Sequence, residues 1–117
     1  MDVQDEGFRH IGRCQRLEHL GRMYRRDTGD QATEHIAALA LKSYYAGQTR
    51  ITDRSLEILS RMESLERLEF YACPGITNAG IARLARLPRL REVGLESITA
   101  VTNEVVRRFP ATVHVRY

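Results

Sequence analysis

The chain has 117 residues, of which 43% are hydrophobic, so it can bury the core of a single domain and lacks the composition of a disordered chain. Its formal net charge is +3, with 18 Lys and Arg mixed among 15 Asp and Glu, and this mixing argues against a nucleic-acid-binding surface. No apolar run approaches the roughly 18 residues that a membrane span needs, and the polar N-terminal segment MDVQDEGFRH does not resemble a signal or transit peptide.

A repeat with a step of 25 residues organises the chain. Thr52, Thr77 and Thr102 are separated by this step, and apolar residues on both sides of each threonine recur with them. The sequence therefore predicts a single domain, 1–117, built of similar units. We expect a partial unit at 3–16, full units at about 17–40, 41–64, 65–89 and 90–111, and a terminal strand at 112–117.

The first full unit departs from the others at Arg22. This arginine stands where later units have Phe70 and Leu95, and a charged side chain directed into a core is costly unless it is paired. Either the strand shifts so that Met23 or Tyr24 turns inward, or the unit is an irregular edge of the array. We favour the irregular edge, because the following turn also carries extra residues.

Each unit has the pattern of a strand followed by a short helix. An alternating x-L-x-L stretch predicts a short strand with one buried face. The threonine and the Asp or Asn after the next turn can cap a helix N-terminus with a side-chain oxygen. Leu56, Leu59 and Met62 then lie on one side of a helix, and Pro88 follows the equivalent stripe of a later unit, where it can end the helix. Such units, all in one direction, stack into a parallel-sheet solenoid.

The full pattern is L-x-x-L-x-L-x-x-C/I-x-x-I/V-T-N/D, and its strongest instance is LERLEFYACPGITNAGIARLARLP, at 65–88. This pattern resembles the leucine-rich repeat family, in its cysteine-containing subtype, over about residues 3–109. The subtype is known from F-box substrate receptors of ubiquitin ligases, from bacterial repeat proteins and from the mitochondrial ATP synthase subunit s group. The resemblance implies an α/β fold, a short right-handed solenoid with parallel strands on its concave side and short helices on its convex side.

The strand positions between the apolar residues are the candidate binding site. Repeat arrays bind partners along such surfaces, and Tyr and Arg are common interface anchors. The predicted contact residues are His19, Ser43, Tyr45, Arg67, Glu69, Tyr71, Glu92 and Glu96. They predict a non-enzymatic module that binds another protein through the concave strand face. Alternatively, these residues are ordinary solvated strand positions. The alternative function is that of an assembly subunit, or of a segment of a larger repeat protein, that docks or self-associates through its open N-terminal end.

No other motif favours a catalytic, cofactor or metal site. The four histidines are not spaced as metal ligands, and phosphate-binding and nucleophile-elbow motifs are absent. Cys73 occupies the loop position that names the subtype, where a buried structural thiol is expected, and Cys14 is expected in the core. Free thiols suit a reducing, intracellular compartment. The arginines of RLARLPRLR, at 83–91, are expected on the solvated convex face, with binding of an anionic partner as the alternative.

Overall fold

The computed structural model of the chain describes residues 17–23 and 29–117. The expected partial unit at 3–16, Cys14 and the turn at 24–28 lie outside these residues. Strands and helices alternate along the described chain. The strands are β1 (His19–Met23), β2 (Ser43–Gly47), β3 (Arg67–Tyr71), β4 (Glu92–Glu96) and β5 (His114–Arg116). The helices are α2 (Asp30–Ile36), α3 (Asp53–Leu59), α4 (Asn78–Arg83), continued by the 3₁₀ turn η1 (Leu84–Arg86), and the 3₁₀ helix η2 (Asn103–Arg108).

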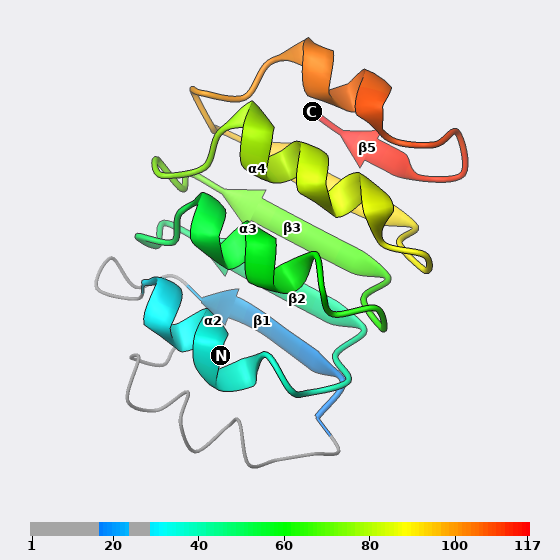
Figure 1. Ribbon diagram of the computed structural model, residues 1–117. Helices are drawn as coiled ribbons and strands as arrows, with labels where there is room; N and C mark the ends of the chain where they lie inside the picture. Colours follow the sequence, from blue (N-terminus) through cyan, green and yellow to red (C-terminus); the bar gives the residue numbers. More distant parts are fainter. Residues whose placement is uncertain (1–16, 24–28) are drawn as a thin grey trace.

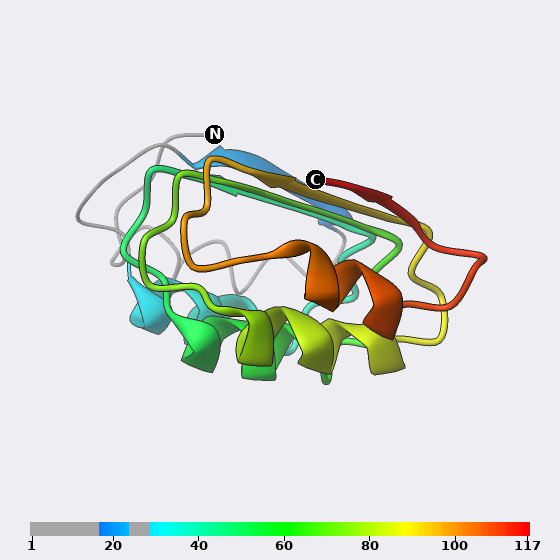
Figure 2. The same ribbon diagram turned by 90° about the horizontal axis from the view of Figure 1, so that it is seen from above.

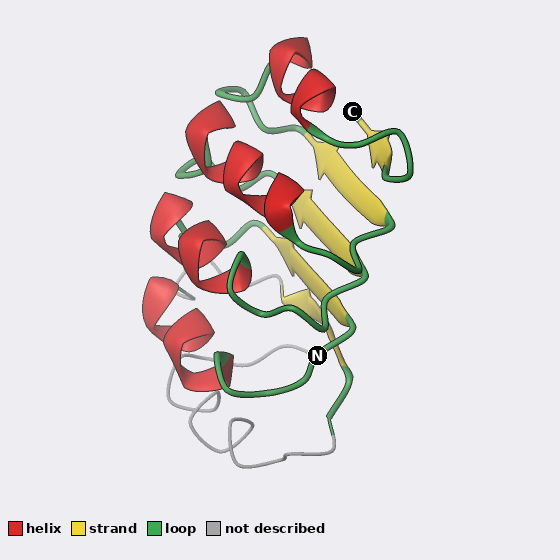
Figure 3. Ribbon diagram, turned by 45° about the vertical axis from the view of Figure 1, so that its right-hand side comes forward, coloured by secondary structure: helices red, strands yellow, loops and turns green. Residues whose placement is uncertain are grey.

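The five strands form one parallel sheet in the order β1-β2-β3-β4-β5, so each strand lies beside the next strand of the chain. The helices cover one face of the sheet in a second layer (Figures 1 and 2). Figure 3 shows the two layers from the side, with the helices in a row that follows the order of the strands. The expected α/β class is therefore confirmed, and the strands are parallel, as the repeat predicts.

The core lies between the sheet and the helices. In the central strands the pairing is in step, so Tyr44 is in register with Leu68 and Leu68 with Val93. The Tyr44 ring also lies 6.2 Å from the Phe70 ring, centroid to centroid. Both rings are buried, and burying such a side chain contributes about 1.5–3 kcal/mol to folding. The stripe of Leu56, Leu59 and Met62 is buried on the helical side, as expected.

Near Arg22 the backbone of β1 shows a shift of the strand, the alternative that we did not favour. Leu20 pairs with Tyr44, and the next pair is Met23 with Ala46. Between these two pairs β1 therefore contains one residue more than β2. The extra residue moves Arg22 out of the register position that Phe70 has in β3. The strand thus follows the alternative in which it shifts and brings Met23 to that position.

The expected helix caps are only partly present, because the polar side chains bind across units. Thr52 accepts a hydrogen bond from the Arg54 amide, as an N-cap should, but Thr77 and Thr102 make no side-chain cap bond. Instead, the Thr77 amide and hydroxyl both donate to the Asp53 carboxylate, at 2.8 and 2.5 Å. The prediction of local capping is therefore wrong for these two threonines.

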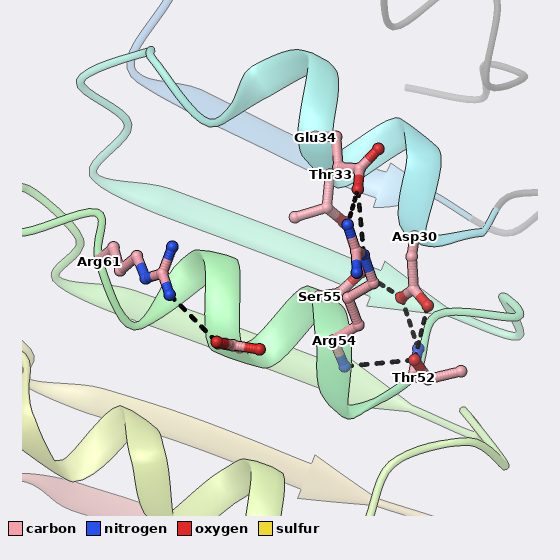
Figure 4. Close-up of polar contacts among 8 residues, drawn as sticks. Asp30, Thr33, Glu34, Thr52, Arg54, Ser55 and Arg61 are labelled. Carbon is pink, nitrogen blue, oxygen red and sulfur yellow. Dashed lines mark hydrogen bonds and ion pairs between the residues drawn. The ribbon is translucent and has the colours of Figure 1, made fainter.

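The same bond pair recurs on both sides of this unit. The Thr52 amide and hydroxyl donate to Asp30, at 2.8 and 2.5 Å (Figure 4). The Thr102 amide donates to Asn78 Oδ1, and Asn78 Nδ2 donates to the Thr102 hydroxyl, both at 2.9 Å. The resulting series, which we call the Asx–Thr ladder, joins the N-terminus of each helix to the start of the next one.

The turns that follow β2, β3 and β4 have a common backbone. Gln48, Ala72 and Ser97 have φ values of 54°, 50° and 56°, in the left-handed region that L-residues rarely adopt. Cys73 follows Ala72 and is fully buried, with its thiol 3.4 Å from the Tyr71 carbonyl oxygen and 3.5 Å from the Thr49 hydroxyl. The expected burial of Cys73 is confirmed, and the thiol packs within the stacked turns.

Candidate functional site: the open face of the sheet

The face of the sheet opposite the helices, which we call the open face, carries all eight predicted contact residues. Strand register arranges its residues in three rows across the sheet. The first row is His19, Ser43, Arg67, Glu92 and His114. The second row is Tyr45, Glu69, Gly94 and Arg116. The third row is Gly47, Tyr71 and Glu96.

The first two rows are largely compensated in charge and hydrogen bonding. His19 Nδ1 lies 2.9 Å from Ser43 Oγ. Arg67 Nε lies 3.6 Å from a Glu92 carboxylate oxygen. Arg116 forms a hydrogen-bonded ion pair with Glu69, and this bond, with the attraction of the nearby carboxylates, raises the pKa of the Arg116 guanidinium.

The third row is different, because the Glu96 side chain makes no ion pair or hydrogen bond within residues 17–23 and 29–117. Its side chain is exposed, and it acts on Arg116 only as a nearby charge. Tyr71 beside it is half-buried, and within the same residues its hydroxyl has no hydrogen-bond partner. The C-terminal ends of β3 and β4 thus present a carboxylate and a phenol that remain available to a ligand.

Two adjoining hollows run across the open face. The larger, which we call the tyrosine hollow, has a volume of about 280 Å³. It is lined by Tyr45, Glu69, Phe70, Tyr71, Gly94, Leu95, Glu96, Arg116 and Tyr117. The smaller has a volume of about 190 Å³ and lies over β1, β2 and β3. It is lined by His19, Leu20, Ser43, Tyr44, Tyr45, Arg67 and Glu69. Tyr45 and Glu69 line both, so the two hollows lie side by side, and we call them together the depression.

The depression brings together seven of the eight predicted contact residues. Glu92 lines neither hollow, but its carboxylate pairs with Arg67, which lines the smaller one. Tyr45 and Tyr71 are half-buried rather than fully exposed, since neighbouring strands shield their rings. The floor of the tyrosine hollow at Gly94 is covered by two side chains, because a Cβ atom there would lie 3.0 Å from the Arg116 guanidinium and 3.2 Å from the Glu69 side chain.

Arg116 and Tyr117 belong to the site and were not predicted. The signal for Arg116 was present, since Val115 faces the core beside Val93 and the alternation of a strand directs its neighbour outward. Tyr117 follows β5, and no sequence pattern indicated that its hydroxyl would donate to the Val101 carbonyl oxygen, at 2.7 Å. That bond holds the ring over the end of the sheet while 59% of the residue's surface stays exposed.

A second polar cluster lies on the helical side and is internally satisfied (Figure 4). Asp30 accepts from Thr52 and from the Ser55 hydroxyl, and Ser55 is 2.7 Å from the buried Thr33 hydroxyl. Partial burial opposes ionisation of Asp30, but these hydrogen bonds outweigh it, so its pKa lies below the usual value. Burial raises the pKa of Tyr44, which lies 3.5 Å from Thr33. The cluster joins α2, α3 and β2, and all of its polar atoms have partners.

Two other kinds of site find no support in the described residues. No group of three or more His, Cys, Asp or Glu there could hold a metal ion. No helix among them is both long and apolar enough to cross a membrane.

No protein-family model matches the chain, and no curated protein matches it.

Proposed function

We propose that this chain is a leucine-rich repeat protein of the cysteine-containing type, a short right-handed solenoid that binds another protein through its open sheet face. The alternation of strand and helix supports the repeat assignment, as do the equivalent turns after three strands. The Asx–Thr ladder supports it further, because each step links the same positions of consecutive units. In such an array each unit is stabilised mainly by its neighbours.

The observation that carries the binding function is the depression formed by the two adjoining hollows on the open face. Half-buried tyrosines line it, and they offer rigid contact area at a low entropic cost to a partner. Five strands about 4.8 Å apart give a face roughly 20 Å wide, which accommodates about six residues of an extended peptide. The partner in this proposal is therefore a peptide segment or the edge of a small domain, and the role of the chain is recognition rather than catalysis.

Partner capture with two variants tests the binding function. The wild-type chain is used to identify a partner, and the isolated partner is then titrated against each variant. Tyr45→Ser combined with Tyr71→Ser alters the open face, and we expect a loss of affinity of about thirtyfold or more, as for central aromatic anchors. The control is Arg61→Ser, which removes the exposed ion pair with Glu57 on the helical side. Its affinity should match the wild type.

Melting temperatures of the variants show whether each is folded before binding is compared. Loss of affinity in the tyrosine variant alone supports the open face as the binding site. Equal affinity of all three proteins contradicts it and moves the contact to the ends of the sheet or to the helices.

The alternative function is assembly through the N-terminal end. Within the described residues β1 forms one edge of the sheet, and an edge strand can pair with another chain. Light scattering with small-angle X-ray scattering distinguishes the two proposals. A monomer at high concentration favours the open face as the interface, whereas a dimer elongated along the sheet order favours docking through β1.

A further inference from the structure

We propose that the tyrosine hollow receives the cationic side chain of an Arg or Lys residue of the partner, bound by Glu96 and the rings of Tyr45, Tyr71 and Tyr117. This inference rests on the proposed binding function and specifies the chemistry of the partner segment.

The charge balance of the hollow is the first argument. Its charged lining residues are Glu69, Glu96 and Arg116, and the Glu69 carboxylate is already bound by Arg116. One negative charge, that of Glu96, is left without an ionic partner there, although the whole chain carries a net charge of +3. A partner that covers the hollow with apolar groups would desolvate the Glu96 carboxylate without compensation, and an acidic group would be repelled. A cationic group compensates the charge.

The aromatic walls are the second argument, and it is independent of the first. Three tyrosines line the same hollow, and the faces of aromatic rings attract Arg and Lys cations. The Tyr117 ring is held by its hydrogen bond to Val101, so it does not have to be ordered on binding. The Tyr71 hydroxyl, without a partner in the described residues, can in turn accept a hydrogen bond from a guanidinium or ammonium group.

The size of the hollow is the third argument. Its volume of about 280 Å³ leaves room for a long, narrow side chain beside Glu96, although the space directly above Gly94 is already filled by Arg116 and Glu69. Such a side chain can align its methylene groups with the tyrosine rings while its charged end reaches the Glu96 carboxylate.

Selection from a random peptide library tests the inference without knowledge of the natural partner. The whole wild-type chain is immobilised, and linear peptides displayed on phage are selected for binding. We expect the enriched peptides to share an Arg or Lys. In a synthetic copy of the best binder, replacement of the essential Arg by citrulline, or of Lys by acetyl-lysine, removes the charge and should weaken binding about fivefold.

Variants of the chain assign the effect to Glu96. In Glu96→Gln the affinity for the cationic peptide should fall about fivefold, and the neutral peptide should bind this variant and the wild type equally well. The control is Glu104→Gln, which removes the same charge from an exposed position on η2 and should leave both affinities unchanged. The preference for the cationic peptide should also decrease as the salt concentration rises.

The outcomes separate the inference from the proposed function. Peptides whose binding is lost in the Tyr45→Ser, Tyr71→Ser variant but that share no cationic residue overturn the inference and leave the binding function standing. The inference also fails if the cationic and neutral peptides bind the wild type equally, or if Glu96→Gln retains the full preference. The binding function fails together with the inference if the peptides bind the Tyr45→Ser, Tyr71→Ser variant as tightly as the wild type. It also fails if the library yields no binders.

Discussion

Gly80 lies where α4 packs against α3, and the substitution Gly80→Ala gives a sharp test of the structure. A Cβ atom built at Gly80 in α4 would lie 2.2 Å from Asp53 Oδ1, 2.7 Å from Asp53 Cγ and 2.8 Å from Leu56 Cδ1. The Asp53 carboxylate would have to move, and it is the group that binds both the amide and the hydroxyl of Thr77. The added methyl therefore breaks one step of the Asx–Thr ladder.

The expected change in the free energy of unfolding is the sum of three contributions, of which the first is stabilising and the other two are destabilising. Helix propensity alone favours alanine over glycine by about 1 kcal/mol. Insertion of a methyl group into a packed site costs about 1–3 kcal/mol. Loss of the two hydrogen bonds from Thr77 to Asp53 costs about 1 kcal/mol for each bond. We therefore expect Gly80→Ala to destabilise the chain by about 2–4 kcal/mol and to lower Tm by about 8–16 °C.

Urea unfolding followed by far-UV circular dichroism measures this change. Gly29→Ala is the control, because a Cβ atom there meets nothing within 4 Å, and it should cost less than about 1 kcal/mol. In an Asp53→Ala background the obstructing carboxylate is gone, so Gly80→Ala should cost much less than in the wild type. A stabilising Gly80→Ala, or an equal cost in both backgrounds, would refute the proposed contact.

Three further predictions concern the turns, the ladder and the thiol. Ala72→Gly should stabilise the chain by about 0.5–1 kcal/mol, because glycine adopts the positive φ of 50° without strain, whereas Ala79→Gly, in α4, should destabilise it by about 1 kcal/mol in the same urea assay. Asp30 has a lowered pKa, so its contribution of about 1 kcal/mol to the free energy of unfolding should be present above pH 4 and lost as the pH falls through the folded-state pKa. Asp30→Asn should therefore cost less stability at pH 3 than at pH 7, and an equal cost at both would contradict this. In a Cys14→Ser background, Cys73 should react with a thiol reagent only as fast as the protein opens, and immediate reaction would contradict its burial.

The fold was predictable from the sequence to a large extent, because apolar spacing determines which face of each element is buried. Leu68 and Phe70 alternate with charged residues, and both are buried on the helical side of β3. The helical stripe that ends at Leu87 is likewise buried, and η1 ends at Arg86, before Pro88. Seven of the eight predicted contact residues line the depression for the same reason, since strand alternation directs them away from the core.

Other features could not be predicted because they depend on how the units stack. Thr77 could have capped its own helix, but the preceding unit brings the Asp53 carboxylate within 2.8 Å of its amide. Ala32, Ser55 and Gly80 are equivalent in the repeat, yet Ser55 donates a hydrogen bond to Asp30 whereas no side chain fits at Gly80. A repeat identifies equivalent positions, but the distance between neighbouring helices decides what each position can hold.

The sequence by itself thus determined the class of the fold, the parallel order of its strands and most of the residues on the open face. These properties follow from the period of the apolar residues, which is local and additive along the chain. The tertiary structure alone decided which charges on that face cancel. Arg116 reaches Glu69, 47 residues earlier in the chain, and this leaves the Glu96 carboxylate without an ionic partner among the described residues. Such pairing depends on distances across strands, which no pattern along one strand contains.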